Sequence, residues 1–465
     1  MSVVPEDMTL AEASRAIARR NLSPVELLDA LRARFEALEP RLNTTIRPLW
    51  DEARQEAAKA GRRIARSGPR SPLDGLPVGL KDIIDIAGHP TTCHSRLLLD
   101  NHKTEDAAVV ARLRAAGAVF PVKLATHEFA IGGPAFDLPF PPARNPWNPG
   151  HHPGGSSSGS GAAVAAGILP AALGTDTGGS VRNPASQCGI VGMKPTYGVV
   201  SRRGVFPLAY SLDHVGPMTR DVASNAMLLN AMAGHDAADP GSVSLRAENY
   251  ARNLRKGLKG LRIGYVRNWH EKDDPATPEV AAALDGAAKL LRREGATLRN
   301  VTLPPLGEFG AVNRTISLSE AAAIHGRWLR ERPEGYSALT RKRLLPGLFI
   351  PAEAYVQAQR RRRELTAAVA AALEEVDLLL TASSLDPACR IDDAAAVEVT
   401  YPRQARTPLN VTGHPALTLM CGVSREGGVP LSLQLVGRWF EEATIYRAAA
   451  AYERAAPWKD LRPPV

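Results

Sequence analysis

After Leu76, short apolar runs alternate with long amphipathic stretches, and this alternation limits the possible folds more than any other property of the chain. The apolar runs predict buried strands over 119–124, 261–266, 376–382, 416–421 and 431–437. The amphipathic stretches predict helices near 219–234, 278–294, 317–330, 352–375 and 441–455. Such alternation is typical of the α/β class. We expect a central mixed, mostly parallel β-sheet flanked by helices on both faces.

The N-terminal part carries helical patterns only. Two capping boxes and one alanine-rich stretch mark three helices: Thr9 with Glu12, Ser23-Pro24 with Glu26, and about 50–66. No repeat or low-complexity linker divides the remainder of the chain. We therefore expect a helical arm, residues 1–66, that packs on one structural unit formed by residues 67–465.

Composition narrows the class of protein further. The 465 residues are 44% hydrophobic and 23% charged, as in ordinary globular proteins. No apolar stretch approaches the roughly 18 residues of a membrane span, and the N-terminus lacks the basic start and apolar run of a secretory signal. We expect a cytoplasmic protein with no membrane partner, in which the four cysteines stay reduced.

The net charge of +9 raises the question of a nucleic-acid partner. Basic residues gather at 341–343 and 360–363, but Glu and Ala are interleaved with them in helical patterns. Solvent-exposed helix faces explain these basic runs better than a nucleic-acid-binding surface does, so no nucleic-acid partner is expected.

Two segments are rich in Gly and Ser: PGGSSSGSG (153–161) and GTDTGGSVRNP (174–184). A phosphate cradle, a flexible linker and a catalytic loop are the three interpretations. Neither segment has the lysine or the complete spacing of a phosphate loop, and each lies between apolar runs, unlike a linker. A catalytic loop accounts for more, because Gly178-Gly179 before Ser180 leaves backbone N–H groups free to stabilise an oxyanion.

A lysine, Lys81, ends the apolar run of GLPVGLKDIID (75–85), where a lysine is unexpected. It is either an edge residue whose ammonium reaches water or a desolvated group whose lowered pKa lets it act as a base. The residues alone leave both interpretations open.

In their order and residue patterns, these three segments closely resemble those of the amidase signature family. Its pattern reads approximately GGSSGGS…GTDTGGSIRxPA after a GxPxxxKD segment. Ser156 is the first serine after the paired glycines, and Ser180 lies 24 positions later, as the pattern expects. The resemblance covers most of the chain, including 194–222 and 410–437. Ser158 departs from it, because glycine is commoner there.

The resemblance implies a single amidase-signature α/β domain that cleaves a C–N acyl bond with no metal or organic cofactor. Ser180 would attack the acyl carbon, and Ser156, after a cis peptide bond, would relay the proton to Lys81. The lysine must be neutral to act as this base, so activity should rise with pH towards neutral or mildly alkaline values. Four backbone amides would form the oxyanion hole: Thr177, Gly178, Gly179 and Ser180.

The resemblance also suggests roles around this centre. Substrate selection beyond the pocket wall would fall on 310–360 and 407–410. Three residues would line the pocket wall that faces the nucleophile: Ala130, Ile131 and Gly132. Three others would support the loops, with the charged pair bracing the nucleophile loop rather than touching substrate: Ser157, Asp176 and Arg182.

Two other arrangements are weaker. Asp213 and His214 suggest a Ser-His-Asp triad, but adjacent residues on an extended segment point to opposite sides, and the lysine already serves as the base. His151 and His152 suggest a metal, but no third ligand lies nearby in the sequence. Neither arrangement is expected.

Competing functions remain. The main alternative is the glutamine-hydrolysing subunit of a tRNA-dependent amidotransferase, which needs partner chains. The signature segments serve both activities. However, segment 126–147, THEFAIGGPAFDLPFPPARNPW, differs from the residue pattern associated with those subunits. A catalytically inactive binding homologue is a second alternative. We expect a small-molecule substrate that is neutral and fairly apolar, an amide or a carbamate. A homodimer is common in the family, but the sequence gives neither the leaving group nor the oligomeric state.

Overall fold

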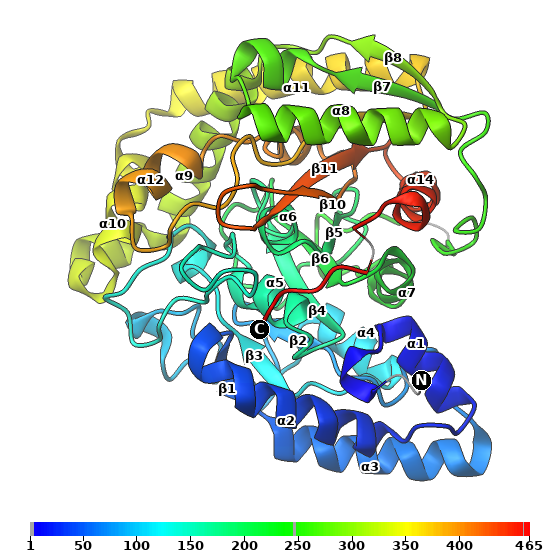
Figure 1. Ribbon diagram of the computed structural model, residues 1–465. Helices are drawn as coiled ribbons and strands as arrows, with labels where there is room; N and C mark the ends of the chain where they lie inside the picture. The colour runs from blue at the N-terminus through cyan, green and yellow to red at the C-terminus, as the bar shows by residue number, and fades with distance from the viewer. Residues whose placement is uncertain (1–3, 245–247, 459) are drawn as a thin grey trace.

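The computed structural model describes residues 4–244, 248–458 and 460–465, and its strands form one sheet (Figure 1). The strands are β1 (Thr45–Pro48), β2 (Gly79–Lys81), β3 (Val122–Leu124), β4 (Ala171–Asp176), β5 (Val191–Lys194), β6 (His214–Thr219), β7 (Arg262–Val266), β8 (Thr297–Val301), β9 (Leu378–Ala382), β10 (Ala416–Val423) and β11 (Pro430–Val436). Their order across the sheet is β1-β3-β2-β4-β6-β5-β10-β11-β9-β7-β8.

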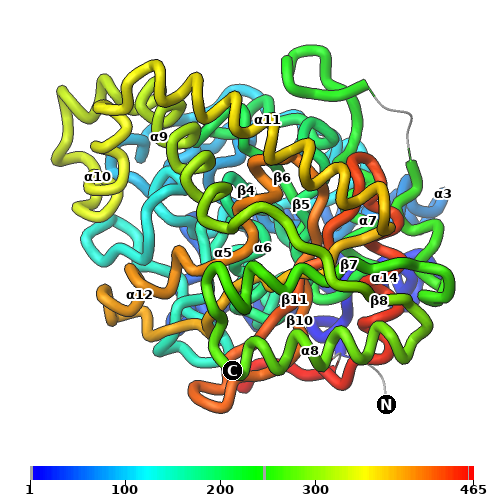
Figure 2. The backbone as a smooth tube through the Cα atoms, turned by 90° about the horizontal axis from the view of Figure 1, so that it is seen from above, coloured from blue at the N-terminus to red at the C-terminus, as the bar shows by residue number. Residues whose placement is uncertain are grey.

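Helices surround the sheet. They are α1 (Leu10–Ala18), α2 (Pro24–Leu42), α3 (Trp50–Ser67), α4 (Ala108–Ala116), α5 (Ser158–Ala165), α6 (Arg182–Cys188), α7 (Val222–Met232), α8 (Pro278–Arg293), α9 (Leu306–Glu331), α10 (Ala338–Leu344), α11 (Ala352–Glu375), α12 (Ala394–Thr400), α13 (Pro408–Thr412) and α14 (Glu442–Ala455). The mutually contacting helices α5 and α6 lie on the other side of the central strands from α7 and α14 (Figure 1). Seen from above, α8 and α11 run beside β7 and β8 (Figure 2).

The α/β class is confirmed, but the expectation of a mostly parallel sheet is wrong. Within the described residues, four of the ten strand pairings are parallel: β2 with β3 and β4, and β7 with β8 and β9. The strands from β4 to β9 across the centre pair antiparallel throughout. A short turn joins β10 to β11, and such a turn can connect only antiparallel neighbours, whereas parallel pairs need a crossover.

The strands and helices predicted from the apolar runs and amphipathic stretches are present, with shifted ends. The largest difference is at α9, which begins at Leu306 rather than near 317. β1 and β8 escaped prediction, and so did four short strands: β2, β4, β5 and β6. The three to six residues of these four strands are fully buried and include glycine or proline, so neither alternation nor strand propensity marks them.

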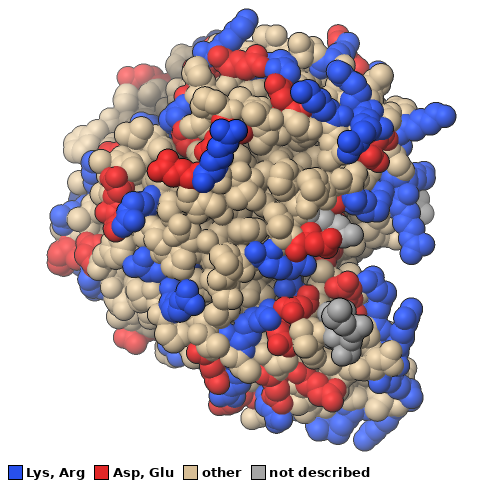
Figure 3. Space-filling view, viewed as in Figure 1, with Lys and Arg blue, Asp and Glu red and all other residues tan. Residues whose placement is uncertain are grey.

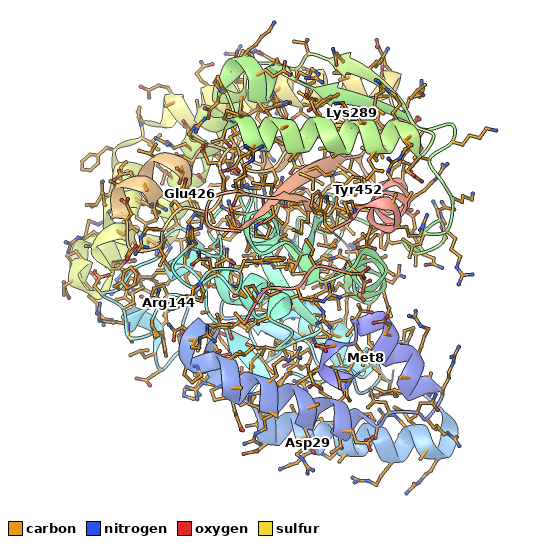
Figure 4. The ribbon with its side chains drawn as sticks, in the orientation of Figure 1. Met8, Asp29, Arg144, Lys289, Glu426 and Tyr452 are labelled. Atoms are coloured by element: carbon orange, nitrogen blue, oxygen red, sulfur yellow. The ribbon has the colours of Figure 1, made fainter. Side chains whose placement is uncertain are left out.

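The N-terminal arm contains both predicted capping boxes, and it also contributes a strand. β1 pairs antiparallel with β3, so the sheet extends into the segment expected to be purely helical. Leu28 and Leu31 of α2 belong to the same hydrophobic cluster as Tyr452 of α14. On the outer side of α2, Asp29 accepts hydrogen bonds from Arg54 of α3 at 2.8 and 3.0 Å (Figure 4).

Charges of both signs are mixed over the face shown in Figure 3. The basic runs have acidic partners: Arg361 pairs with Glu308 and Glu364, and Lys342 with Glu398. The four cysteines are free thiols. No helix in the described part of the chain combines the length and apolar character needed to cross a membrane.

Candidate active site

Three parallel strands bring the candidate segments to one edge of the sheet. β2, β3 and β4 are parallel neighbours, and they end at Lys81, Leu124 and Asp176. The carboxyl ends of parallel strands lie at the same edge, where ligands bind in α/β folds. Lys81, the segment after Leu124 and the loop after Asp176 therefore meet, although they are far apart in the sequence.

The Lys81 side chain is completely buried, with 0% exposure. Its Nζ lies 2.7 Å from the Ser156 Oγ and 2.8 Å from the Thr175 Oγ1. Burial lowers the pKa of Lys81 from its ordinary 10.5 to about 7, although the nearby carboxylates of Asp176 and Asp213 act in the opposite direction. The interpretation of Lys81 as an edge residue that reaches water is therefore wrong: the amine is desolvated, and its role as a base stays a prediction.

The loop before α5 presents Ser156 to this amine. The Gly155–Ser156 peptide bond is cis. The Ser156 carbonyl accepts hydrogen bonds from the His127 N–H and the Thr126 Oγ1, both at 3.0 Å. A Cβ on Gly155 would lie 2.1 Å from the His127 ring, so only glycine fits between the two loops.

A serine hydroxyl ties this loop to β4. The Ser157 Oγ accepts from the Thr175 N–H at 3.2 Å and donates to the Thr175 carbonyl at 3.3 Å. The Ser157 N–H also donates to the Ser180 carbonyl at 3.3 Å. Ser157 therefore contacts both β4 and the loop that follows it, residues 177–180, which carries the predicted nucleophile Ser180 and is called the nucleophile loop below.

A buried ion pair, Asp176 with Arg182, anchors the backbone of the nucleophile loop. Asp176 accepts from the backbone N–H of Gly179 at 2.8 Å and of Val181 at 3.1 Å. Its carboxylate also pairs with Arg182 at 2.8 Å, and both side chains are fully buried. Burial alone would raise the pKa of Asp176, but the charge of Arg182 and its hydrogen bonds hold that pKa far below the usual value. Asp176 and Arg182 therefore stabilise the conformation of this loop.

One member of the predicted oxyanion hole needs correction. The Gly179 N–H already donates to the Asp176 Oδ1, so it faces the loop's interior and is not free for an oxyanion. The N–H groups of Thr177, Gly178 and Ser180 make no hydrogen bond within the described residues. The glycine content of the loop could not show which backbone N–H donates to the Asp176 carboxylate.

The Ser180 hydroxyl makes no hydrogen bond within the part of the chain that the structure describes. The structure thus joins Lys81 to Ser156, whereas the link from Ser156 to Ser180 is not closed in it. Hydrogen bonds between catalytic groups are often long without substrate and tighten in the complex.

Ser180 lines an open cleft. All three predicted wall residues line it, and so do residues of the stretch predicted to select substrate: Ala130, Ile131, Gly132, Asn313, Ser317 and Arg343. Tyr401 and Gln404 also line it, and the sequence reasoning missed them. Among the described residues that form this lining, Arg343 is the one with a formal charge.

A family model described as Amidase matches residues 26–446. The chain belongs to the amidase signature family of C–N hydrolases. The segments that contain Lys81, Ser156 and Ser180 lie within the matched range, and so do the strands of the described sheet.

Relatives of this amidase-signature chain carry more than one activity in their names. It is 39% identical to a glutamyl-tRNA(Gln) amidotransferase subunit of Geobacter metallireducens, with 97% of this chain and 98% of the relative covered. The native peptide amidase of Stenotrophomonas maltophilia superposes with a TM-score of 0.87 at 30% identity, with 99% and 98% coverage. A protein complex described as vestigial, which reveals the origins of an s-triazine catabolic enzyme, includes a chain with a TM-score of 0.90 at 33% identity and 96% and 98% coverage.

In this amidase-signature chain, Asp213 and His214 point apart. Asp213 accepts from the Thr177 Oγ1 at 2.6 Å, and burial raises the pKa of its carboxyl to about 6. The His214 ring instead contacts the Leu212 carbonyl at 2.7 Å and the Lys194 Nζ at 3.1 Å. These two described residues therefore assemble no Ser-His-Asp triad.

The paired histidines do not form a metal site. The His152 Nδ1 accepts from the Gly154 N–H at 3.0 Å, which shapes the turn before the serine loop. Within the described ranges, no group of three or more His, Cys, Asp or Glu side chains is placed to hold a metal ion.

Two further residues make contacts in the site that the sequence reasoning did not predict. Thr175, inside the recognised GTDTGGS segment, is the second partner of Lys81. Asn410 lies in the stretch predicted to select substrate, but its amide donates to the Asp176 carboxylate at 2.8 Å and to the Asp176 carbonyl at 2.9 Å. Asn410 therefore supports the loop, and the prediction for 407–410 is wrong at this residue.

Proposed function

We propose that this chain hydrolyses a C–N acyl bond through an acyl-enzyme, with Ser180 as nucleophile, Ser156 as proton relay and Lys81 as base. The observation that supports this most is the buried Lys81 amine, 2.7 Å from the Ser156 Oγ and with a pKa lowered to about 7. A serine hydroxyl is a weak nucleophile until a base takes its proton. A half-neutral buried amine at pH 7 provides that base.

The reaction follows from these positions. The Ser180 Oγ bonds to the acyl carbon while its proton passes to Ser156 and the Ser156 proton passes to the Lys81 Nζ. The carbonyl electrons move to oxygen, where the free amides of Thr177, Gly178 and Ser180 stabilise the negative charge. The C–N bond then breaks and the amine leaves with the returned proton. Water repeats the sequence at the acyl-enzyme and releases the acid.

The cleft suggests the substrate class. The Arg343 Nη1 donates to the Ile131 and Gly132 carbonyls at 3.2 and 2.9 Å, and no carboxylate stands among the described lining residues. We propose a small amide whose acyl part carries an acceptor oxygen or a negative charge towards Arg343. This differs from the neutral, fairly apolar substrate expected from the sequence, because Arg343 reaches the cleft from a helix distant in the chain.

The second candidate is the glutamine-hydrolysing subunit of a tRNA-dependent amidotransferase. The amidotransferase subunits among the relatives favour it, at 37 to 40% identity over nearly the whole chain. Free glutamine carries an ammonium group, which proteins usually bind with a carboxylate. The described lining of the Ser180 cleft offers none, which places this candidate second on geometry, whereas the sequence comparisons favour it over the first.

A substrate panel tests the proposal. The purified chain should release amine or ammonia from small amides, with glutamine among the slower substrates. Lys81→Met should lower kcat/KM by about 10³-fold or more, because triad members act as a unit. Lys289→Met, on the exposed side of α8 (Figure 4), is the matched control and should change nothing.

Partner dependence separates the two candidates. If ammonia is released from glutamine only after a partner subunit is added, and no other amide is cleaved, the second candidate replaces the first. If Lys81→Met keeps wild-type turnover, both fail.

A further inference from the structure

Behind the nucleophile loop lies a buried cation without a counter-ion among the described residues. Arg406, between α12 and α13, is 1% exposed. Its Nη1 donates to the Ser384 Oγ at 2.6 Å and to the Ser383 Oγ at 3.4 Å, whereas its Nε has no partner among the described residues. No described carboxylate lies within ion-pair distance of it. Burial lowers the pKa of Arg406 to about 9, so the side chain remains charged at neutral pH.

This guanidinium lies directly against the loop that carries Ser180. A Cβ on Gly179 would be 2.7 Å from the Arg406 Nε and 2.9 Å from the Gln404 Oε1. The Gln404 oxygen is likewise without a described partner, although Gln404 lines the cleft. The orphaned donor thus lies beside the residue that precedes the nucleophile.

The nearest acid cannot neutralise this charge. Asp176 is already paired with Arg182, which in turn donates to the Arg406 carbonyl at 2.8 Å. A buried ion without a partner is unfavourable in the resting protein, and its attraction for a negative charge is strong because water is excluded. During hydrolysis, a new negative charge arises next to this loop when the acyl oxygen becomes an oxyanion.

We propose that Arg406 is a positioning residue for hydrolysis: its unpaired charge stabilises the oxyanion that forms at the 177–180 loop, and its side chain holds Gly179 in place. This inference rests on the proposed function of Ser180. It assigns Arg406 an electrostatic role across the loop, with no contact to substrate.

Arg406→Met and Arg406→Lys test the role of the charge. The first readout is the rate at which a fluorophosphonate labels Ser180, because that reaction also builds negative charge at the loop and needs no known substrate. We expect Arg406→Met to label about 30-fold more slowly, equivalent to about 2 kcal/mol. Arg406→Lys should recover part of the rate. For any amide that is cleaved, kcat should fall while KM stays within about twofold.

Thermal unfolding separates this role from a structural one. Replacing an unpaired buried charge by a similar-sized apolar side chain should leave Tm unchanged or higher. Arg438→Met is the matched control, because Arg438 is a partly buried arginine that donates to the Leu373 and Val376 carbonyls instead. It should label at the wild-type rate.

Two results would overturn the inference. One is wild-type labelling of Arg406→Met. The other is a loss of rate that accompanies a large fall in Tm and that lysine does not restore. If Ser180 of the wild-type chain is not labelled at all, the proposed function itself fails, which is a different result from either.

Discussion

Lys81 decides the pH range in which the site can work. Its ordinary pKa is 10.5, and burial lowers this to about 7. Below pH 7 the amine is protonated and cannot accept the Ser156 proton, whereas above pH 7 it is neutral. We therefore expect kcat/KM to rise with pH through about 7 and then level off.

Asp213 provides a test of this electrostatic balance. Its negative charge favours protonated Lys81, so Asp213→Asn should lower the lysine pKa and move the acidic limb of the kcat/KM profile to lower pH by about one unit. Asparagine keeps the shape and can donate to Thr177 in place of the present hydrogen bond. The profile should be measured from pH 5 to 9, with half-buried Asp285→Asn on α8 as control. A shift to higher pH would contradict this account of the lysine.

At the scale of elements, α5 positions the serine loop through close packing. Every residue of α5 is buried. A Cβ on Gly159 would lie 2.2 Å from the Thr44 carbonyl oxygen and 2.6 Å from the Ala125 nitrogen. Both neighbours are backbone atoms at the ends of β1 and β3, so they cannot move aside without disturbing the sheet.

A pair of substitutions tests this packing. Gly159→Ala should destabilise the protein by about 2–3 kcal/mol, because the core there is already filled. Gly286→Ala is the matched helix control, since nothing lies within 4 Å of its Cβ on α8, and it should stabilise by about 0.5–1 kcal/mol. Urea unfolding measures both. Equal stabilisation by the two changes would show that α5 is not tightly packed.

At the scale of the whole molecule, the N-terminal arm completes the sheet. Removing residues 1–66 would uncover the edge of β3 and the apolar side chains that α2 buries. We expect a chain of residues 67–465 to aggregate rather than elute as a folded species in size-exclusion chromatography. A chain that starts at Thr9 keeps the first capping box and should fold. A folded, active 67–465 chain would instead make the arm a separable unit.

How much the sequence reveals differs between the fold and the site. Periodic apolar runs marked the longer helices and strands, because burial on one face leaves a local pattern. The β2 and β4 strands left none, yet they place Lys81 and the nucleophile loop. The loops that carry the candidate triad were found from motifs, since residue type and spacing within each loop are local properties.

By itself, the sequence determined which segments are the candidates for the chemistry: the one with the lysine after an apolar run and the two glycine-rich loops with the serines. Only the tertiary structure decided that Gly179 gives its amide to Asp176, that Thr175 shares Lys81, and that Arg406 lies behind the loop with no described counter-ion. These facts depend on strand order and on contacts across distant parts of the chain, as in the 94 positions between Lys81 and Thr175. Burial, and with it the pKa of the lysine, is a property of the assembled core.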